Sequence, residues 1–218
     1  MLDIQVAGLA LQVCPQRALY WPQQRCLLVA DVHLGKADTF RQYGIGVPQG
    51  LQHDDLARLK SVLALTNPRR CVVLGDLVHG RILGEETVQA WNALVHSQPS
   101  TQFELVVGNH DQALPADVLS LHAIYPCLEL AGVWFSHEPL PRQQVLQSKG
   151  RLNIHGHLHA AVQLPGSRSK MPALVYQAPH LCLPAFSAFS AGVVLPGAKQ
   201  GLWVFEPEGG TVVSLIGK

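Results

Sequence analysis

The sequence predicts an α/β fold in which helices cover sheets in layers. Between residues 26 and 107, short apolar runs alternate with segments of helical periodicity, and beyond residue 133 strand-like runs follow one another. Alternation of this kind is typical of layered α/β architecture. The chain has 218 residues, of which 48% are hydrophobic and 14% are charged, so it can build a sizeable core. We therefore expect a single domain that spans residues 1–218.

Strands are expected where apolar and β-branched residues are bounded by glycine, proline or polar turns. The early segment alternates apolar and polar residues, with turns at Gly8 and Cys14-Pro15, which predicts antiparallel strands. Later runs are wholly apolar, as in buried strands. In chain order, strands are predicted at 3–6, 9–13, 18–21, 26–30, 71–74, 103–107, 133–136 and 152–155, and then around 175, 180–183, 192–195, 202–205 and 211–215.

Helices are expected in three places. One begins near Leu51 and ends at Asn67-Pro68, because a residue before proline disfavours helical geometry. Another opens with Glu85 and Glu86, whose carboxylates suit the positive end of a helix dipole. A short helix is expected near Pro115–Leu121, and residues 36–50 are expected to form a loop that carries Lys36 and Arg41. The predicted core faces are Leu56, Leu59 and Leu63 in the first helix and Val88, Trp91 and Val95 in the second.

Composition excludes several classes of protein. The net charge is +1, so no global basic field indicates nucleic acid, and any such contact must be local. The five cysteines are scattered and none forms a CxxC pair, which favours a reducing compartment over a disulfide framework. The first residues lack the pattern of a signal peptide, and no run is apolar enough to span a membrane. We expect a cytoplasmic protein with no membrane contact, and its oligomeric state stays open.

Five apolar runs each end in a residue that can bind a metal ion. In open α/β sheets, ligands bind outside the carboxyl ends of strands, so we expect these side chains to meet at one edge. The first of them follow residue 30 and the last follow residue 155. The predicted ligands are Asp31, His33, Asp76, Asn109, His137, His157 and His159.

The donor set predicts the class of metal. Two carboxylates, one amide oxygen and four imidazoles, without a thiolate, suit Mn²⁺, Fe or Zn²⁺. So many ligands suit two ions, and two close ions need a bridge, for which the Asp76 carboxylate is the natural candidate. Two-metal sites activate a bridging water and neutralise the oxygens of a phosphoryl group. His110, beside Asn109, is well placed to protonate the leaving oxygen.

These motifs, in this order, resemble those of the calcineurin-like metallophosphoesterases. The resemblance runs from Asp31 to His159 and implies a four-layer α/β/β/α sandwich with two central mixed sheets. It implies two divalent ions and gives His110 the role of the acid near the leaving group. One ion would be held by Asp31, His33, Asp76 and His159, and the other by Asp76, Asn109, His137 and His157.

A closer resemblance narrows the substrate. The segments 31–36 and 75–79 are similar to motifs of double-strand-break-repair nucleases, in which a histidine at the position of His79 assists catalysis. The wider pattern, with His137-Glu138-Pro139 and the run 183–189, resembles bacterial ligase-associated DNA damage response endonucleases. This implies a DNA endonuclease in repair, with Mn²⁺ as the first choice of metal. It also suggests a ligase or a helicase as partner proteins.

Other readings stay open. The same metals would serve a phosphohydrolase of small nucleotides or lipid-sugar diphosphates, and some proteins of this superfamily are scaffolds without activity. A Ser/Thr phosphatase is disfavoured, because His79-Gly80-Arg81 replaces the Asp-Arg-Gly that follows the bridging aspartate in those enzymes. Lys36 and Arg41 either hold phosphates or belong to a solvated loop. Arg168 and Lys170 suit a plain surface loop better than a nucleic-acid arm.

Overall fold

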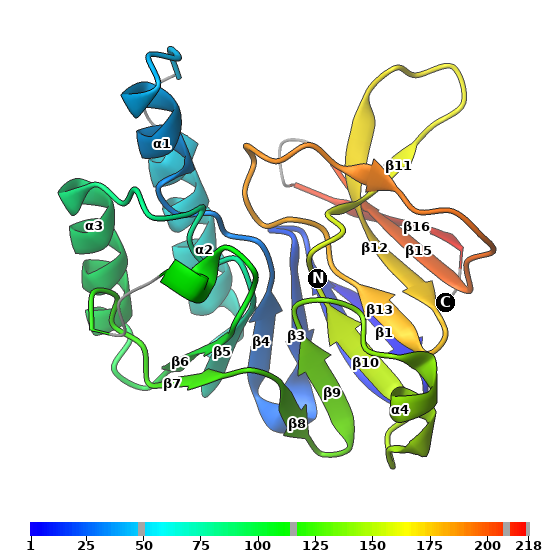
Figure 1. The fold of residues 1–218 in the computed structure, drawn as a ribbon. Helices are drawn as coiled ribbons and strands as arrows, with labels where there is room; N and C mark the ends of the chain where they lie inside the picture. The colour runs from blue at the N-terminus through cyan, green and yellow to red at the C-terminus, as the bar shows by residue number, and fades with distance from the viewer. Residues whose placement is uncertain (48–50, 114–116, 207–209, 217–218) are drawn as a thin grey trace.

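The computed structural model describes residues 1–47, 51–113, 117–206 and 210–216, and two sheets lie face to face at its centre (Figure 1). In the first sheet, the strands β1 to β7 lie side by side in sequence order. Its first four strands are antiparallel, and β4 to β7 are parallel. The strands are β1 (Leu2–Val6), β2 (Leu9–Cys14), β3 (Ala18–Trp21), β4 (Cys26–Val29), β5 (Arg70–Leu74), β6 (Gln102–Val106) and β7 (Ala123–Tyr125).

The second sheet has the order β14-β11-β12-β13-β10-β9-β8, and β15 pairs with both β12 and β16. Strands β9, β10 and β13 run parallel, so they end at the same edge. The strands are β8 (Leu128–Leu130), β9 (Val133–Ser136), β10 (Leu152–His155), β11 (Ala160–Gln163), β12 (Lys170–Gln177), β13 (His180–Cys182), β14 (Val193–Val194), β15 (Gly201–Phe205) and β16 (Val212–Ile216).

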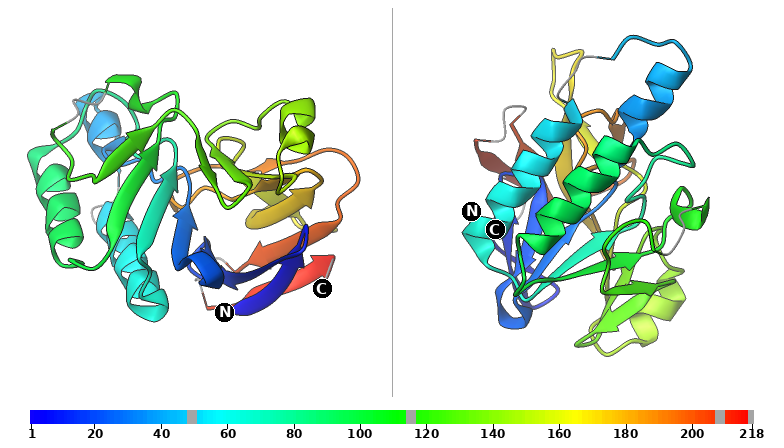
Figure 2. Two further views of the ribbon diagram at one scale, coloured as in Figure 1. Left: turned by 90° about the horizontal axis from the view of Figure 1, so that it is seen from below. Right: turned by 90° about the vertical axis from the view of Figure 1, so that its left-hand side faces the viewer.

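Helices complete the layers. In Figure 2, α2 (Leu51–Thr66) and α3 (Glu85–His96) lie on the face of the first sheet that is turned away from the second sheet. The short helix α4 (Arg142–Gln147) lies beside the second sheet, and α1 (Lys36–Gln42) rises above the strand ends (Figure 1). Two 3-10 helices are η1 (Pro22–Gln24) and η2 (Asp111–Ala113). The predicted α/β/β/α sandwich is thereby confirmed. No helix in the described ranges is long and apolar enough to cross a membrane.

Alternation along the strands explains why the central runs are apolar throughout. Successive side chains point to opposite faces of a sheet, so each face of a central strand needs apolar residues. Leu28 faces the second sheet in one cluster, together with Ile154 of that sheet. Leu27 faces the helices in another, where it joins Leu59 and Trp91. Both faces of β4 are therefore buried, as the fully apolar run predicts.

Three expectations about elements need correction or qualification. The segment that carries Lys36 is the helix α1 and not a loop; it is only seven residues long, too short for its periodicity to be visible. The helix expected near Pro115–Leu121 lies partly outside the described residues, and 117–119 form a turn and bend. The sequence also hid β7, β8, β11 and α4, which are three to six residues each. The extent of the domain, residues 1–218, stays a prediction.

Candidate metal centre

The predicted ligands follow strands that end at one edge of the sandwich. β4, β5 and β6 of the first sheet and β9 and β10 of the second all carry them, and these strands run parallel within their sheets. Backbone hydrogen bonds also join the segments beyond the strands, as in Asp31 N–H to Gly75 O at 3.1 Å and His33 N–H to Asp76 O at 2.9 Å. All seven predicted ligands, together with His79 and His110, are thereby brought into one connected cluster.

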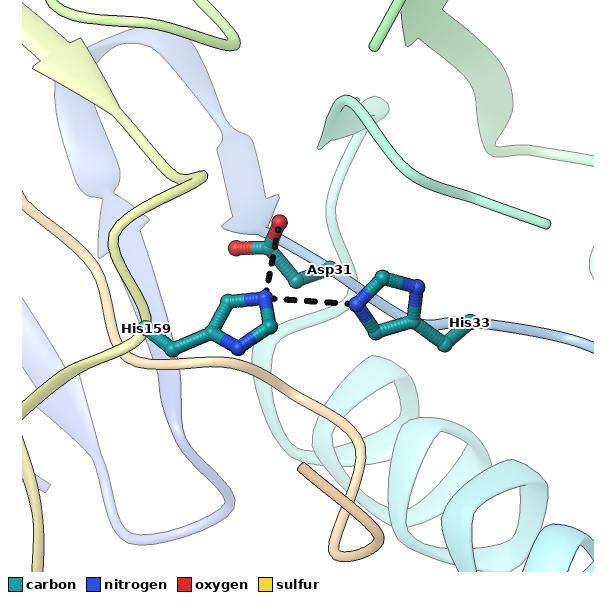
Figure 3. A group of neighbouring side chains, drawn as sticks. All are labelled: Asp31, His33 and His159. Carbon is teal, nitrogen blue, oxygen red and sulfur yellow. Dashed lines mark hydrogen bonds and ion pairs between the residues drawn. The ribbon is translucent and has the colours of Figure 1, made fainter. Parts of the chain in front are cut away.

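One half of the cluster contains Asp31, His33 and His159 (Figure 3). The two imidazoles point their Nε2 atoms at each other across 3.2 Å. His159 Nε2 also lies 3.5 Å from Oδ1 of Asp31. The carboxylate is fully buried, and the backbone N–H of His157 donates to both of its oxygens, at 3.2 and 3.0 Å. The three donor atoms therefore face a common point, as ligands of one ion do.

The other half is centred on His137. Its Nδ1 lies 3.1 Å from the carbonyl oxygen of Leu74, which only accepts, so Nδ1 carries the proton and Nε2 has a free lone pair. That lone pair faces Asn109 Oδ1 at 2.9 Å and His157 Nδ1 at 3.0 Å. Asp76 Oδ1 is 3.5 Å away. The acceptors His137 Nε2, Asn109 Oδ1 and Asp76 Oδ1 repel one another unless a cation lies among them, so this donor set fits a divalent metal ion.

The two halves share their carboxylates. Asp31, Asp76 and His137 can offer donor atoms within 4.8 Å of one another, and Asp31 also belongs to the first half. Asp76 is 3% exposed, and its Oδ1 accepts the backbone N–H of His110 at 2.9 Å. Two buried carboxylates this close are costly when both are charged, and bound cations remove that cost.

Backbone strain concentrates at the cluster. Five of the seven predicted ligands have positive φ angles, between 47° and 65°, a region that residues with a Cβ seldom adopt. Such strain persists only where surrounding contacts enforce it, and it gathers at functional sites. The five residues are Asp31, His33, Asp76, His157 and His159.

Two glycines let the ligands approach. A Cβ on Gly108 would lie 2.3 Å from Asp76 Oδ1 and 2.4 Å from the Asp76 nitrogen. A Cβ on Gly75 would lie 2.1 Å from Nδ1 of His137, and Gly75 has a φ of +74°. Neither position has room for another residue, which explains why a glycine stands at both strand ends.

The surroundings lower the pKa of His33 and raise the pKa of His159. Burial, with a contribution from the Lys36 ammonium, lowers the pKa of His33 to about 2, so its imidazole keeps the lone pair that a metal needs. Burial also acts against a charge on His159, but the hydrogen bond and charge of Asp31 outweigh it and raise the pKa of His159. A carboxylate thus attracts a positive charge at this point.

The two predicted catalytic histidines stack on each other beside the cluster. The ring centroids of His79 and His110 are 5.2 Å apart with planes 17° from parallel. His110 Nδ1 lies 3.0 Å from the carbonyl oxygen of His79, so Nδ1 carries a proton and Nε2 is the atom that can exchange one. His110 Nε2 is 3.8 Å from Oδ2 of Asp76. Burial, Lys36 and His110 lower the pKa of His79 to about 4.

One positioning residue was not singled out from the sequence, although it stands in the Asn-His-Asp turn. Asp111 is buried, and its carboxylate accepts the backbone N–H of Val78 at 3.0 Å and that of Gly108 at 2.8 Å. It therefore joins the turn that carries His79 to the turn that carries Asn109. Burial raises the pKa of Asp111, and those two hydrogen bonds act against the rise.

The segment 186–192 also contributes to the site. Phe186 N–H donates to Ala30 O at 2.7 Å and Ser187 N–H donates to Asp31 O at 3.2 Å, so the segment holds the backbone of the first ligand. Helix α2 holds the segment in turn, because Asp55 accepts the N–H of Ala188 and Arg58 pairs with Asp55 at 2.6 Å. The run 183–189 was noted in the sequence for its resemblance alone; no local signal indicated these contacts.

The remaining candidates separate clearly. Lys36 is half-buried and borders a small pocket together with His33, whereas Arg41 is paired with Asp38 at 3.1 Å on the exposed side of α1. Lys170 lies at the start of β12 and borders a pocket next to His159, while Arg168 is exposed. His155 is buried, and its ring lies 5.8 Å from that of His180.

Comparison with known proteins finds a similar structure over nearly the whole chain. The crystal structure of the nuclease MPE from Pseudomonas putida is 30% identical and covers 98% of this chain and 99% of that chain, with a TM-score of 0.80. The phosphoesterase Yfce from E. coli is 14% identical, with a TM-score of 0.47 and coverage of 86% and 96%, and is too distant to bear on the chemistry. No curated protein matches the chain significantly.

A family model gives the final comparison. The model of the calcineurin-like phosphoesterases matches residues 24–177, a range that includes every predicted ligand from Asp31 to His159. The chain therefore belongs to the calcineurin-like phosphoesterase family.

Proposed function

We propose that this metal-dependent phosphoesterase is a dinuclear phosphodiesterase that cleaves DNA during repair. The observation that carries the proposal is the meeting of atoms that can ligate a metal at two adjoining points, around His137 and between His33 and His159. The likeness to a nuclease over nearly the whole chain supports a nucleic-acid substrate.

The donor sets indicate how two ions would be held. Asp31, His33, Asp76 and His159 would hold one, and Asp76, Asn109, His137 and His157 the other. Two such ions activate a water as nucleophile and neutralise the charge that develops on the phosphoryl oxygens. Oxygen and nitrogen donors without sulfur suit Mn²⁺, with Fe and Zn²⁺ as alternatives.

The chain's own residues handle the proton of the leaving oxygen. His110 Nε2 is the atom that can hold this proton, because Nδ1 is occupied by the His79 carbonyl oxygen. The ring of His79 stacks on that of His110 and so helps to position it. A positioned acid that donates in the transition state contributes typically about 10²–10⁴-fold to a rate.

The surface beside the cluster favours a polymeric substrate. An open groove of about 300 Å³ adjoins the second half of the cluster and is bordered by Asn109, His137, Gln112 and Leu140. A small metabolite would need an enclosing pocket, because ligand sites bury most of a small molecule. A strand of nucleic acid can lie along an open groove and present one phosphate to the metals.

The proposed role in DNA repair also suggests a substrate, partner proteins and a cellular location. DNA is the proposed substrate, a ligase or helicase of a repair system the proposed protein partner, and the cytoplasm the proposed location. These assignments rest on the resemblance of the motifs and on the scattered cysteines.

The first experiment compares a chromogenic phosphodiester with its monoester in the presence of Mn²⁺. Wild-type protein, His110→Ala and the control His96→Ala would be assayed together, since His96 is exposed at the end of α3. We expect diester turnover in the wild type and the control and a large loss in His110→Ala. Preference for the monoester would point to a small-molecule phosphatase, and metal binding without turnover of either would point to a scaffold.

A further inference from the structure

Three cations outside the metal cluster are anchored on the segment 186–192. Lys36 Nζ donates to Ser190 Oγ at 3.3 Å, and Arg17 Nη1 donates to the Ser187 carbonyl oxygen at 3.2 Å. Lys170 Nζ donates to the carbonyl oxygen of Gly192 at 3.0 Å. The segment itself carries no charged side chain, so each cation is held in place by a neutral oxygen.

The three cations have hydrogen-bond donors and positive charge available to bind an anion. Within the described ranges, none of them forms an ion pair with a carboxylate. Asp55, whose charge acts on Arg17, is already occupied by Arg58 and by the N–H of Ala188. An ammonium has three donors and a guanidinium has five, so one neutral acceptor each leaves most of them free. A cluster of cations without counter-charges attracts anions.

The cations lie directly beside the cluster. Lys36 and His33 border the same small pocket, which places Lys36 next to the first half of the site. Arg17, Lys170, Ser190 and His159 border one pocket. Ser190 therefore joins the two positions, because its hydroxyl accepts from Lys36 while its other side borders the pocket.

The size of the pocket limits what can enter it. It holds about 40 Å³, far below the volume that a nucleoside or a drug-sized ligand occupies. The oxygens of a single phosphate group match both the size and the positive charge. In Figure 1 the segment runs, in orange, between the helices of the first sheet and the β11–β12 hairpin, so a strand that crosses the metal site can continue along it.

We propose that Lys36, Arg17 and Lys170 form a phosphate track along the segment 186–192, which binds backbone phosphates of the nucleic acid next to the one being cleaved. The inference deepens the proposed function and rests on it. It explains how a chain with a net charge of +1 can bind a polyanion through a local concentration of positive charge. Arg41, on the other side of α1, does not belong to the track.

The test measures the salt dependence of DNA binding. A fluorescent single-stranded oligonucleotide would be titrated with Mn²⁺-loaded protein at several salt concentrations, using His110→Ala as the parent so that the probe stays intact. Lys36→Met and Lys170→Met each remove one phosphate contact, so the slope of log K against log salt falls by about 0.7 per variant. The matched control Arg41→Met also removes a positive charge and should keep the parent slope.

Two further measurements make the outcome decisive. Thermal unfolding of every variant checks the fold, and if Arg17→Gln does not fold, the two lysine variants carry the test alone. Wild-type turnover of the chromogenic diester tests the proposed function separately. If the wild type is active and Lys36→Met and Lys170→Met keep the parent slope, or Arg41→Met lowers it equally, the track is refuted. If the lysine variants weaken the binding of inorganic phosphate but keep the parent slope for the oligonucleotide, the site binds free phosphate and the nucleic-acid track is refuted.

Discussion

Nε2 of His137 lies 2.9 Å from Oδ1 of Asn109, although neither atom carries a proton that the other could accept. The tautomer of His137 is set by the carbonyl oxygen of Leu74. A contact of two lone pairs at this distance is stable only when a cation lies between or beside them. The arrangement of this pair therefore indicates that the site binds a cation.

Metal binding should stabilise the protein. Removal of metal by a chelator should lower the melting temperature, and Mn²⁺ should restore it, because a ligand that binds only the folded state adds about 2.7 kcal/mol at one hundred times its Kd. His137→Ala should lose most of this response, and His96→Ala should keep it. Differential scanning fluorimetry against metal concentration measures both. An equal response in His137→Ala would show that His137 is not a ligand.

Asp76→Asn should separate metal binding from folding. The amide is isosteric with the carboxylate, so the fold should persist, but the loss of a bridging negative charge should empty at least one metal position. Metal content by mass spectrometry and diester turnover check the two effects together. Full occupancy of both positions in Asp76→Asn would contradict the bridging role.

Gly108→Ala should damage the site from within the backbone. Its Cβ would meet Asp76 Oδ1 at 2.3 Å and the Asp76 nitrogen at 2.4 Å, so one of the two turns must move. Overpacking of this kind costs typically about 1–3 kcal/mol. The matched control is Gly46→Ala, where a Cβ meets nothing within 4 Å. Gly108→Ala should be less stable in urea and bind less metal than Gly46→Ala. Equal values would show that the turns can move without cost.

Asp111→Asn should loosen the turns that carry His79 and Asn109. The amide can still accept one backbone N–H, but its NH₂ group cannot accept the other, which leaves a buried donor unpaired at a cost of about 1–3 kcal/mol. Turnover should fall along with stability. Asp117→Asn, at an exposed position, is the control for the change of charge. If Asp111→Asn keeps the stability and the turnover rate of the wild type, Asp111 does not position the site.

His155 should make the metal-free protein sensitive to acid. Burial, helped by the neighbouring histidines, lowers the pKa of His155 from 6.5 to about 4. Above pH 6.5 the residue is neutral in both states and costs nothing. As the pH falls from 6.5 to 4, the unfolded chain gains a proton that the folded chain refuses, so stability falls. Between pH 6.5 and 4, the free energy of unfolding measured in urea should fall less steeply for His155→Gln than for the wild type. The same dependence on pH in both proteins would show that His155 does not cause the loss of stability.

The sequence was sufficient to predict the architecture and to predict that the proposed ligands would lie together, because both depend on local patterns. Each buried strand is an apolar run, and each run stops at a polar group that the parallel topology carries to one edge. The helix α1 was hidden because seven residues after Gly35 are too few to display a period. Short strands such as β7 and β8 depend on neighbours across the sheet more than on their own residues.

Contacts between distant segments could not be predicted. The stacking of His79 on His110, 31 residues along the chain, depends on the distance between two strand ends. The hydrogen bond of Arg17 to the carbonyl oxygen of Ser187 joins residues 170 positions apart. Nothing in the neutral run 183–189 reveals that it supports a ligand at the other end of the chain.

Phe186 and Ser187 donate hydrogen bonds to the backbone of Ala30 and Asp31. These contacts determine when the site can be completed during synthesis of the chain. A growing chain that has just passed His159 already contains every predicted ligand, yet it lacks the segment that holds the first of them in its strained conformation. The ribosome must add nearly thirty further residues before that segment exists at all. The metal centre of this phosphoesterase therefore stays without its support for Asp31 until the segment 186–192 has been synthesised.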